Sequence, residues 1–304
     1  MKPISLFSRQ CGLRLQRGYS TKSPSPIISA LKAHPPKIIP DYLTPMPSHL
    51  LTTTINDLLH PSTTIPTITS PPKALPQGHH LVYFPIQLPP SRLIPDGADP
   101  DHSPGTPYVR RVWAGGEVTF RGEEMKLDAR PAVCREKIED VSLRGREGEE
   151  KVFVDIWRKY GTGHDIEGRE EWDIEERRTL VFMREEKESA SSPARLLKSL
   201  SFNAHSIHFD PQFAQEVDGH RALLVHGPFT LALMLHVLND QIGSGASVHK
   251  FSYRNYAPLY VNESLSINVR RVSKDEGVEG RWDVWIEGPE GGMAVKGTAN
   301  IVTK

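Results

Sequence analysis

The chain has 304 residues, of which 38% are apolar and 24% charged, a composition typical of a folded protein with one large or two ordinary domains. Its formal net charge is zero, so no electrostatic argument points to nucleic acid or to an anionic membrane as a partner. No stretch reaches the roughly 20 consecutive apolar residues that a membrane-spanning helix requires. Two cysteines, Cys11 and Cys134, are too few for a disulfide framework or a set of zinc ligands. We expect Cys134 to be a small, partly buried apolar residue and not a nucleophile.

The first 40 residues contain no acidic side chain, and their basic residues are separated by apolar residues and serine. This composition is typical of a mitochondrial transit peptide. The segment Arg17-Gly18-Tyr19-Ser20 also resembles a matrix-processing site. We therefore expect residues 1–19 to be an import signal that directs the protein to the mitochondrial matrix. A disordered basic tail on a cytosolic protein is the alternative.

Residues 20 to about 110 are rich in proline, serine and threonine, which predicts short and well-separated elements. One helix is predicted over residues 50–59, because Leu51, Ile55, Leu58 and Leu59 fall on one face. The pair His79-His80 has no third ligand at suitable spacing, so a loop is expected there and not a metal site.

Strand patterns begin near Val109. Residues 111–120 mix aromatic and β-branched side chains around the pair Gly115-Gly116, which predicts a strand with a bulge or turn. Residues 152–157 and 174–183 are two further predicted strands. The charge-dense stretches 123–150 and 164–178 are expected to be mostly solvated edges. Gly161-x-Gly163 lacks the strand–turn–helix setting of a dinucleotide site. Residues 184–193 are polar, small and end in proline, as expected of an interdomain linker.

The second half has a clearer pattern. Gly227-Pro228 precedes an apolar segment, residues 229–241, with Gly243 just past its end, which predicts a helix buried on most sides. Four strands with a period of two follow, near 248–256, 265–269, 282–286 and 293–301. One long helix followed by antiparallel strands is an α+β pattern in which a sheet wraps a buried helix, the hotdog architecture.

Four short blocks, in this order along the chain, carry the most specific signal: Arg111-x-Trp113-Ala114-Gly115-Gly116, Phe202-Asn203-Ala204-His205-x-Ile207-His208, Val225-His226-Gly227-Pro228 and Phe251-Ser252-Tyr253-Arg254. Together they resemble the MaoC-like hydratase/dehydratase family. Within it they are most similar to the long mitochondrial type 2 hydroxyacyl-thioester dehydratases and the mesaconyl-CoA hydratases. The resemblance extends from about Leu81 to the C-terminus and implies a double hotdog, two antiparallel sheets each wrapped around a long central helix.

The resemblance also implies roles for individual residues. His208 falls on the family's catalytic histidine, and Gly227 on the glycine whose N–H donates to the thioester oxygen. Asn203 stands where the family usually has a catalytic aspartate. An amide cannot act as a base, so His208 is expected to carry the proton alone while Asn203 orients the hydroxyl group or water. His205 is a candidate second proton carrier.

Other residues near these blocks receive supporting roles. His226 is expected to support the turn before the helix. Arg254, with Tyr253 beside it, is a candidate for holding the carrier arm or an acyl carboxylate, and a charge at the sheet edge is an equally good interpretation. Trp113 and the glycine pair are assigned to the structure of the first domain.

The domains predicted from these patterns are a transit peptide (1–19), a degenerate hotdog domain (40–188) and a catalytic hotdog domain (194–304). The resemblance implies dehydration of (3R)-3-hydroxyacyl thioesters in mitochondrial fatty-acid synthesis, on acyl carrier protein or CoA, with no metal or nucleotide cofactor. Hydration of a short branched enoyl-CoA such as mesaconyl-CoA is the enzymatic alternative. A non-catalytic scaffold that binds acyl carriers is another, and the chain is compatible with a homodimer.

Overall fold

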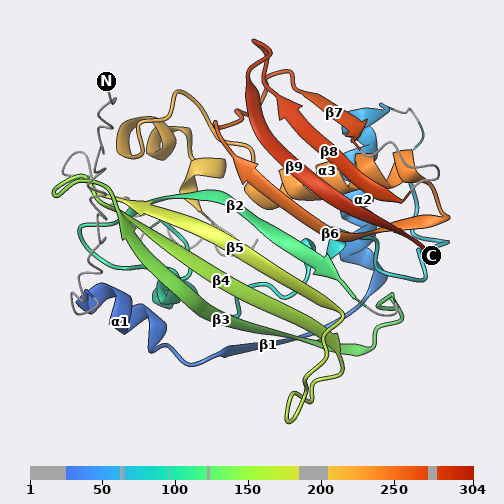
Figure 1. Ribbon diagram of the computed structural model, residues 1–304, viewed down its shortest axis with the longest axis horizontal. Helices are drawn as coiled ribbons and strands as arrows, with labels where there is room; N and C mark the ends of the chain where they lie inside the picture. Colours follow the sequence, from blue (N-terminus) through green and yellow to red (C-terminus); the bar gives the residue numbers. More distant parts are fainter. Residues whose placement is uncertain are drawn as a thin grey trace, which may run out of the picture.

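The computed structural model describes residues 25–61, 64, 66–94, 96–121, 124–184, 205–272 and 279–304 (Figure 1). The import signal predicted for residues 1–19, nearly all of the predicted linker and Asn203 lie outside the described residues. Within the described part, no helix has the length and apolar character needed to cross a bilayer.

The described strands form one continuous antiparallel sheet in the order β1-β3-β4-β5-β2-β6-β9-β8-β7. In each half the strand that follows the helical segment, β2 or β6, lies at the centre, with the last strand of that half beside it. The two halves are joined where β2 pairs with β6 (Figure 1). The bounds are Lys37–Tyr42 (β1), Arg110–Phe120 (β2), Pro131–Arg144 (β3), Lys151–Thr162 (β4), Ile174–Met183 (β5), Ala246–Asn255 (β6), Ser266–Arg271 (β7), Gly280–Glu287 (β8) and Met293–Thr303 (β9).

The long helix of the second half, α3 (Gly227–Ile242), begins at Gly227, within two residues of the position predicted from the sequence. It ends at Gly243, whose φ of 72° is in the left-handed region that glycine adopts without a steric penalty. The apolar side chains of α3 are buried around the helix, and the helix contacts β6, β7 and β8. The prediction of a helix buried on most sides and followed by four strands is confirmed.

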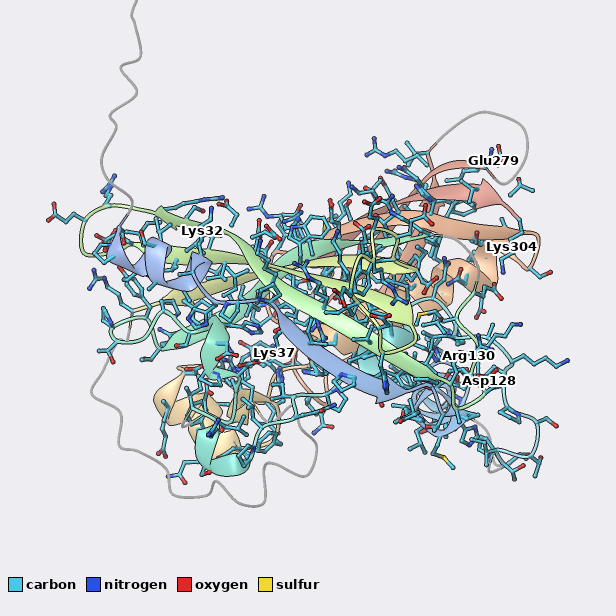
Figure 2. The ribbon with its side chains drawn as sticks, turned by 90° about the horizontal axis from the view of Figure 1, so that it is seen from below. Lys32, Lys37, Asp128, Arg130, Glu279 and Lys304 are labelled. Carbon is cyan, nitrogen blue, oxygen red and sulfur yellow. The ribbon has the colours of Figure 1, made fainter. Side chains whose placement is uncertain are left out.

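The first half differs from the prediction, because its long helix is not enclosed by its own strands. Helix α2 (Pro45–Leu59) starts five residues before the predicted position and lies beside α3 (Figure 1), where Leu51 and Ile55 pack with Ala232 and Leu233. Short helical turns precede β2 instead, at His79–Val82 (η1), Pro90–Arg92 (η2) and Pro100–His102 (η3). Helix α1 (Pro26–Lys32) packs on β3, where the Lys32 ammonium lies 3.3 Å from Asp140 (Figure 2).

The glycine pair of β2 lies at the junction of the two half-sheets. The strand has the predicted irregularity, a register shift between Trp113 and Gly115. A Cβ atom on Gly116 would lie 2.0 Å from the carbonyl oxygen of Arg177, and one on Gly115 would lie 2.5 Å from that of Tyr253. Only glycine permits this close approach of β5 and β6 to β2.

The expectation that residues 123–150 and 164–178 are solvated edges is wrong for their central residues. Residues 131–144 form β3, an interior strand between β1 and β4. Glu136 is 7% exposed and Glu176 is fully buried. Each carboxylate is paired with an arginine of the same sheet, Glu136 with Arg158 on the adjacent strand β4 and Glu176 with Arg178 two residues along β5. This pairing is what allows a charged pattern to occupy a buried strand.

Candidate active site

A cavity of about 990 Å³ lies between the two halves and is lined by residues of both. Its wall contains the predicted residues His205, His208 and Gly227, together with His226. The first half contributes Arg111, Trp113, Arg158 and Arg178 to the same wall. Segments far apart in the sequence therefore meet at one site, and Asn203 lies outside the described residues.

His208 lies at the end of a short turn, η5 (Ser206–His208), and is held in one orientation. Its Nδ1 is 3.0 Å from the carbonyl oxygen of Leu224. A carbonyl can only accept, so Nδ1 carries the proton and Nε2 has the lone pair. Burial lowers the pKa of His208, and Arg111 contributes in the same direction. His208 is therefore neutral at pH 7, with the lone pair of Nε2 available to accept a proton or a hydrogen bond.

His205 has a carboxylate partner that no sequence motif indicated. Its Nε2 lies 3.3 Å from Oδ2 of Asp96, and its ring centroid lies 5.8 Å from that of His208. Arg111 lies 3.6 Å from the same carboxylate oxygen. Burial lowers the pKa of His205 to about 4, with Arg111 adding to the effect, although Asp96 opposes it. Burial would raise the pKa of Asp96, but Arg111 and His205 lower it to about 2.

The N-terminus of α3 faces the cavity through Gly227. The N–H groups of Phe229 and Thr230 both reach the carbonyl oxygen of His226, at 3.0 and 3.2 Å. The N–H of Gly227 stands before this first turn and has no intrahelical acceptor, so it can donate to a ligand at the positive end of the helix dipole. The His226 ring lies 4.7 Å from that of His208, and burial lowers its pKa to about 3.

Trp113 was expected to be purely structural, yet its ring also borders this helix start. A Cβ atom on Gly227 would be 3.4 Å from the Trp113 ring. The indole Nε1 donates to the Tyr253 hydroxyl oxygen at 2.9 Å, and Tyr253 is itself 7% exposed. Tyr253 thus lies in the core behind Trp113. Arg254 is exposed, with its guanidinium 5.4 Å from the ring centroid of Tyr256, a residue that lines the cavity.

Arg158 and Arg178 line the cavity, together with the carboxylates of Asp99 and Glu136. Arg178 lies 5.0 Å from the ring centroid of Trp113 and lowers the pKa of His226, behind the larger effect of burial. Its Nε and Nη2 bond to Glu176 at 2.7 and 2.8 Å. Because Glu176 does not line the cavity, the guanidinium stands between this carboxylate and any ligand. Sequence reasoning missed Arg178, which lies within one of the stretches interpreted as a solvated edge.

One group of described residues has ligand types suitable for a metal ion. The ligand atoms of Asp99, His102 and Glu136 lie within 4.8 Å of one another. However, Lys37 lies 2.7 Å from Asp99, and Arg158 lies 3.1 Å from Glu136 (Lys37 is labelled in Figure 2). These cations already neutralise the carboxylates, so the cluster is a poor fit for a metal. In the buried pair of η1, His79 is hydrogen-bonded to Ser48 at 2.7 Å, and His80 Nε2 lies 3.6 Å from Glu176, beyond hydrogen-bond distance.

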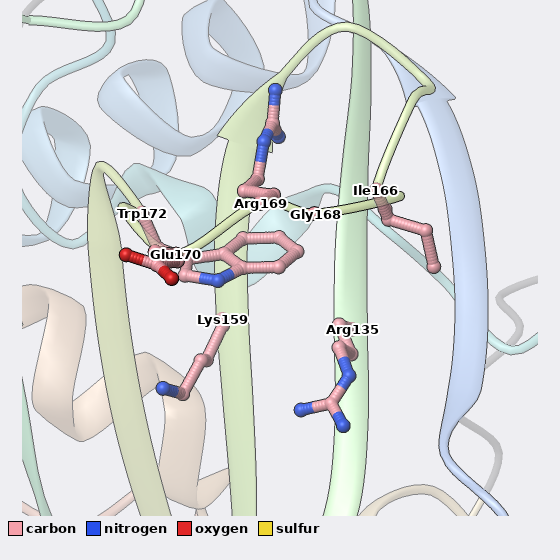
Figure 3. Close-up of a pocket in the computed structure, with 7 residues that line it drawn as sticks. All are labelled: Arg135, Lys159, Ile166, Gly168, Arg169, Glu170 and Trp172. Carbon is pink, nitrogen blue, oxygen red and sulfur yellow. The ribbon is translucent and has the colours of Figure 1, made fainter.

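A second pocket, of about 530 Å³, lies in the first half apart from these histidines (Figure 3). Its residues are Arg135, Lys159, Ile166, Gly168, Arg169, Glu170 and Trp172. Arg169 packs over the Trp172 ring at 5.1 Å and donates to the carbonyl of Thr162. None of these residues is a histidine, whereas the larger cavity has several.

Two relatives match most of the chain. A mesaconyl-C(4)-CoA hydratase of Chloroflexus aurantiacus is 28% identical over 268 residues, which cover 80% of this chain and 88% of the relative. A mitochondrial hydroxyacyl-thioester dehydratase type 2 of Schizosaccharomyces pombe is 23% identical over 269 residues, which cover 76% of this chain and 88% of the relative.

Solved structures agree on the fold. A protein of Mycobacterium tuberculosis with a double hotdog fold superposes with a TM-score of 0.54 at 11% identity, covering 88% of this chain and 97% of that one. A MaoC-like dehydratase of Phytophthora capsici gives a TM-score of 0.59 at 14% identity, covering 90% and 97%. The predicted double hotdog is confirmed, with its two sheets joined edge to edge.

The fold is a double hotdog, and the relatives are named as a hydratase and a dehydratase, which are both hydro-lyases. The family described as hydroxyacyl-thioester dehydratase type 2 matches residues 78–199 and 192–261. The chain belongs to this family.

Proposed function

We propose that this protein dehydrates (3R)-3-hydroxyacyl thioesters to trans-2-enoyl thioesters in mitochondrial fatty-acid synthesis. The observation that carries the proposal is the neutral His208, which lines one cavity together with Gly227 at the start of α3. An unprotonated imidazole can take a weakly acidic proton, and a helix N-terminus stabilises the negative charge that develops on the thioester oxygen.

The reaction follows from this geometry. His208 Nε2 removes a proton from C2 of the acyl group while the N–H of Gly227 donates to the thioester oxygen. The C3–O bond breaks as the C2=C3 double bond forms, and the same proton passes from Nε2 to the departing oxygen. Water leaves, and the imidazole is neutral again. Asn203 is proposed to orient the hydroxyl group, and Trp113, backed by Tyr253, to form the wall beside the thioester.

The two halves are proposed to have different tasks. Residues 194–304 carry the proton chemistry, and residues 40–188 shape the acyl pocket. Arg254 is proposed to hold the carrier arm, because it is exposed beside Tyr256 at the cavity. The import signal predicted for residues 1–19 and the name of the fission yeast relative support a mitochondrial location. Acyl carrier protein is proposed as the carrier.

A second candidate is hydration of a short branched enoyl-CoA, the reaction named for the Chloroflexus relative. The observation that favours it is the presence of two arginines in the cavity wall. A mesaconyl group bears a carboxylate, and Arg178 and Arg158 line the cavity. A guanidinium in such a wall would bind a carboxylate through charge-assisted hydrogen bonds, whereas a long aliphatic chain would have to desolvate it.

Steady-state assays of the purified chain would decide between these functions. The substrates are (3R)-3-hydroxyacyl thioesters of graded length on both carriers, and mesaconyl-CoA. Turnover that rises with aliphatic chain length on acyl carrier protein supports the first candidate. Turnover restricted to mesaconyl-CoA, and lost in Arg178→Met, supports the second. Binding without turnover of any substrate would identify the non-catalytic scaffold.

A further inference from the structure

Asn203 stands where the wider MaoC-like family usually has an aspartate, and a different carboxylate approaches the site from the other half of the chain. Asp96 lies in the loop before β2, and its Oδ2 is 3.3 Å from His205 Nε2. The backbone carbonyl of Asp96 also accepts from the N–H of Ser206 at 3.0 Å. The loop of the first half therefore holds the start of η5 in the second half directly.

The Asp96 side chain is held in place from two sides. Its Oδ1 accepts from the N–H of Ala98 at 3.0 Å, within its own loop. Its Oδ2 faces both His205 and, at 3.6 Å, Arg111 of β2. Asp96 is 8% exposed, so these bonds are shielded from solvent. The carboxylate is thus fixed by its loop and turned toward the imidazole.

This contact determines which nitrogen of His205 carries the proton. An ionised carboxylate only accepts, so Nε2 is the donor and the lone pair is on Nδ1. His205 lines the cavity, whereas Asp96 does not, so Nδ1 is the nitrogen left for a ligand. Arg111 balances the charge of Asp96. Without that cation, the carboxylate would favour the imidazolium form of His205, which has no acceptor.

We propose that Asp96 is a positioning residue of this site, which through His205 presents an unprotonated Nδ1 to the hydroxyl group or water at C3. This inference rests on the proposed function. His205 Nδ1 accepts a hydrogen bond from the O–H of the 3-hydroxyl group and keeps it on the product water. This hydrogen bond turns a lone pair of the 3-hydroxyl oxygen toward the proton that His208 delivers. His205 itself neither gains nor loses a proton.

The test compares Asp96→Asn, His205→Ala and the double variant by steady-state kinetics of the full chain. We expect Asp96→Asn to lower kcat roughly ten- to a hundredfold, as loss of an orienting partner does, with KM changed much less. In the His205→Ala background the same substitution should have almost no further effect, because its target is gone. Asp283→Asn is the matched control, because Asp283 of β8 is also a buried carboxylate, 4% exposed, with cations beside it. These cations are Arg270, Arg281 and Lys296. It should leave kcat unchanged.

Two results would overturn the inference: an unchanged kcat in Asp96→Asn, or an equal loss of activity with and without His205. A wild-type chain inactive on every thioester would instead reject the proposed function. A second measurement is independent of turnover. Nitrogen chemical shifts of His205 should report the Nε2–H tautomer in the wild type and a mixture of tautomers in Asp96→Asn, and identical shifts in both would also refute the role of Asp96.

Discussion

Two neighbouring histidines of this site have opposite tautomers because their partners differ. His208 donates from Nδ1 to the carbonyl of Leu224, and His205 donates from Nε2 to Asp96. Both imidazoles are neutral near pH 7, because burial lowers the pKa of each. The Asn-x-His-x-x-His spacing predicted that both would be near the substrate, but the tautomers depend on partners 16 and 109 positions away in the chain.

Replacing His208 should remove proton transfer without unfolding the protein. We expect His208→Ala to lower kcat by roughly 10²- to 10⁴-fold, the usual contribution of general acid–base catalysis. Because the pKa of His208 is lowered, the wild-type rate should stay constant down to a pH below the ordinary value of about 6.5 and fall only where His208 becomes protonated. Rate profiles from pH 4 to 8 would check this. Full activity in His208→Ala with none in His205→Ala would place the base on His205.

Arg254 offers a separate test at the cavity rim. If it holds the carrier arm, Arg254→Ala should raise KM more than it lowers kcat, since uniform binding is lost. Arg270→Ala, which removes another partly exposed arginine of the second half, is the comparison. An unchanged KM in a folded Arg254→Ala protein would return Arg254 to the role of a sheet-edge charge.

At the level of elements, the junction of β2 with β5 and β6 depends on glycine. In Gly116→Ala the new methyl group would meet the Arg177 carbonyl at 2.0 Å, and backbone cannot move aside cheaply. We expect a loss of about 3 kcal/mol in the free energy of unfolding, measured by urea denaturation. Gly245→Ala is the control, because nothing lies within 4 Å of its added Cβ. Equal stability of the two variants would show that the half-sheets do not approach as closely as described.

At the level of the whole molecule, buried histidines make folding sensitive to acid. Burial lowers the pKa of His79 and His205 to about 4 and that of His226 to about 3. The unfolded chain binds these protons near pH 6.5, whereas the folded chain does not. The contribution of these histidines to the free energy of unfolding is therefore complete above pH 6.5. It falls as the pH drops toward 4, by up to about 1.4 kcal/mol per pH unit for each histidine.

His79→Gln isolates one of these protons, because His79 contacts Ser48 and does not line the cavity. Urea denaturation at several values of pH should give a smaller slope of unfolding free energy between pH 6.5 and 4 than the wild type, by about 1.4 kcal/mol per pH unit. Identical slopes in His79→Gln and in the wild type would contradict the assignment.

The sequence by itself determined the features that have a local period or a local motif. The start of α3 at Gly227, its end at Gly243 and the four strands after it follow from apolar spacing and from proline and glycine at the helix ends. The blocks around His208 and Gly227 indicated the family in the same way. Within each block, the spacing of the residues is set by a few positions of chain.

Only the tertiary structure decided what depends on partners distant in the chain. Strand β3 was missed because Glu136 is buried through its pairing with Arg158 and His102, and a charged pattern alone indicates a solvated edge. Helix α2 lies beside α3, although the two helices come from different halves of the chain. Asp96 contacts His205, which is 109 positions away in the sequence. No local period records such contacts, because they are stabilised by desolvation and charge pairing between segments that only folding brings together.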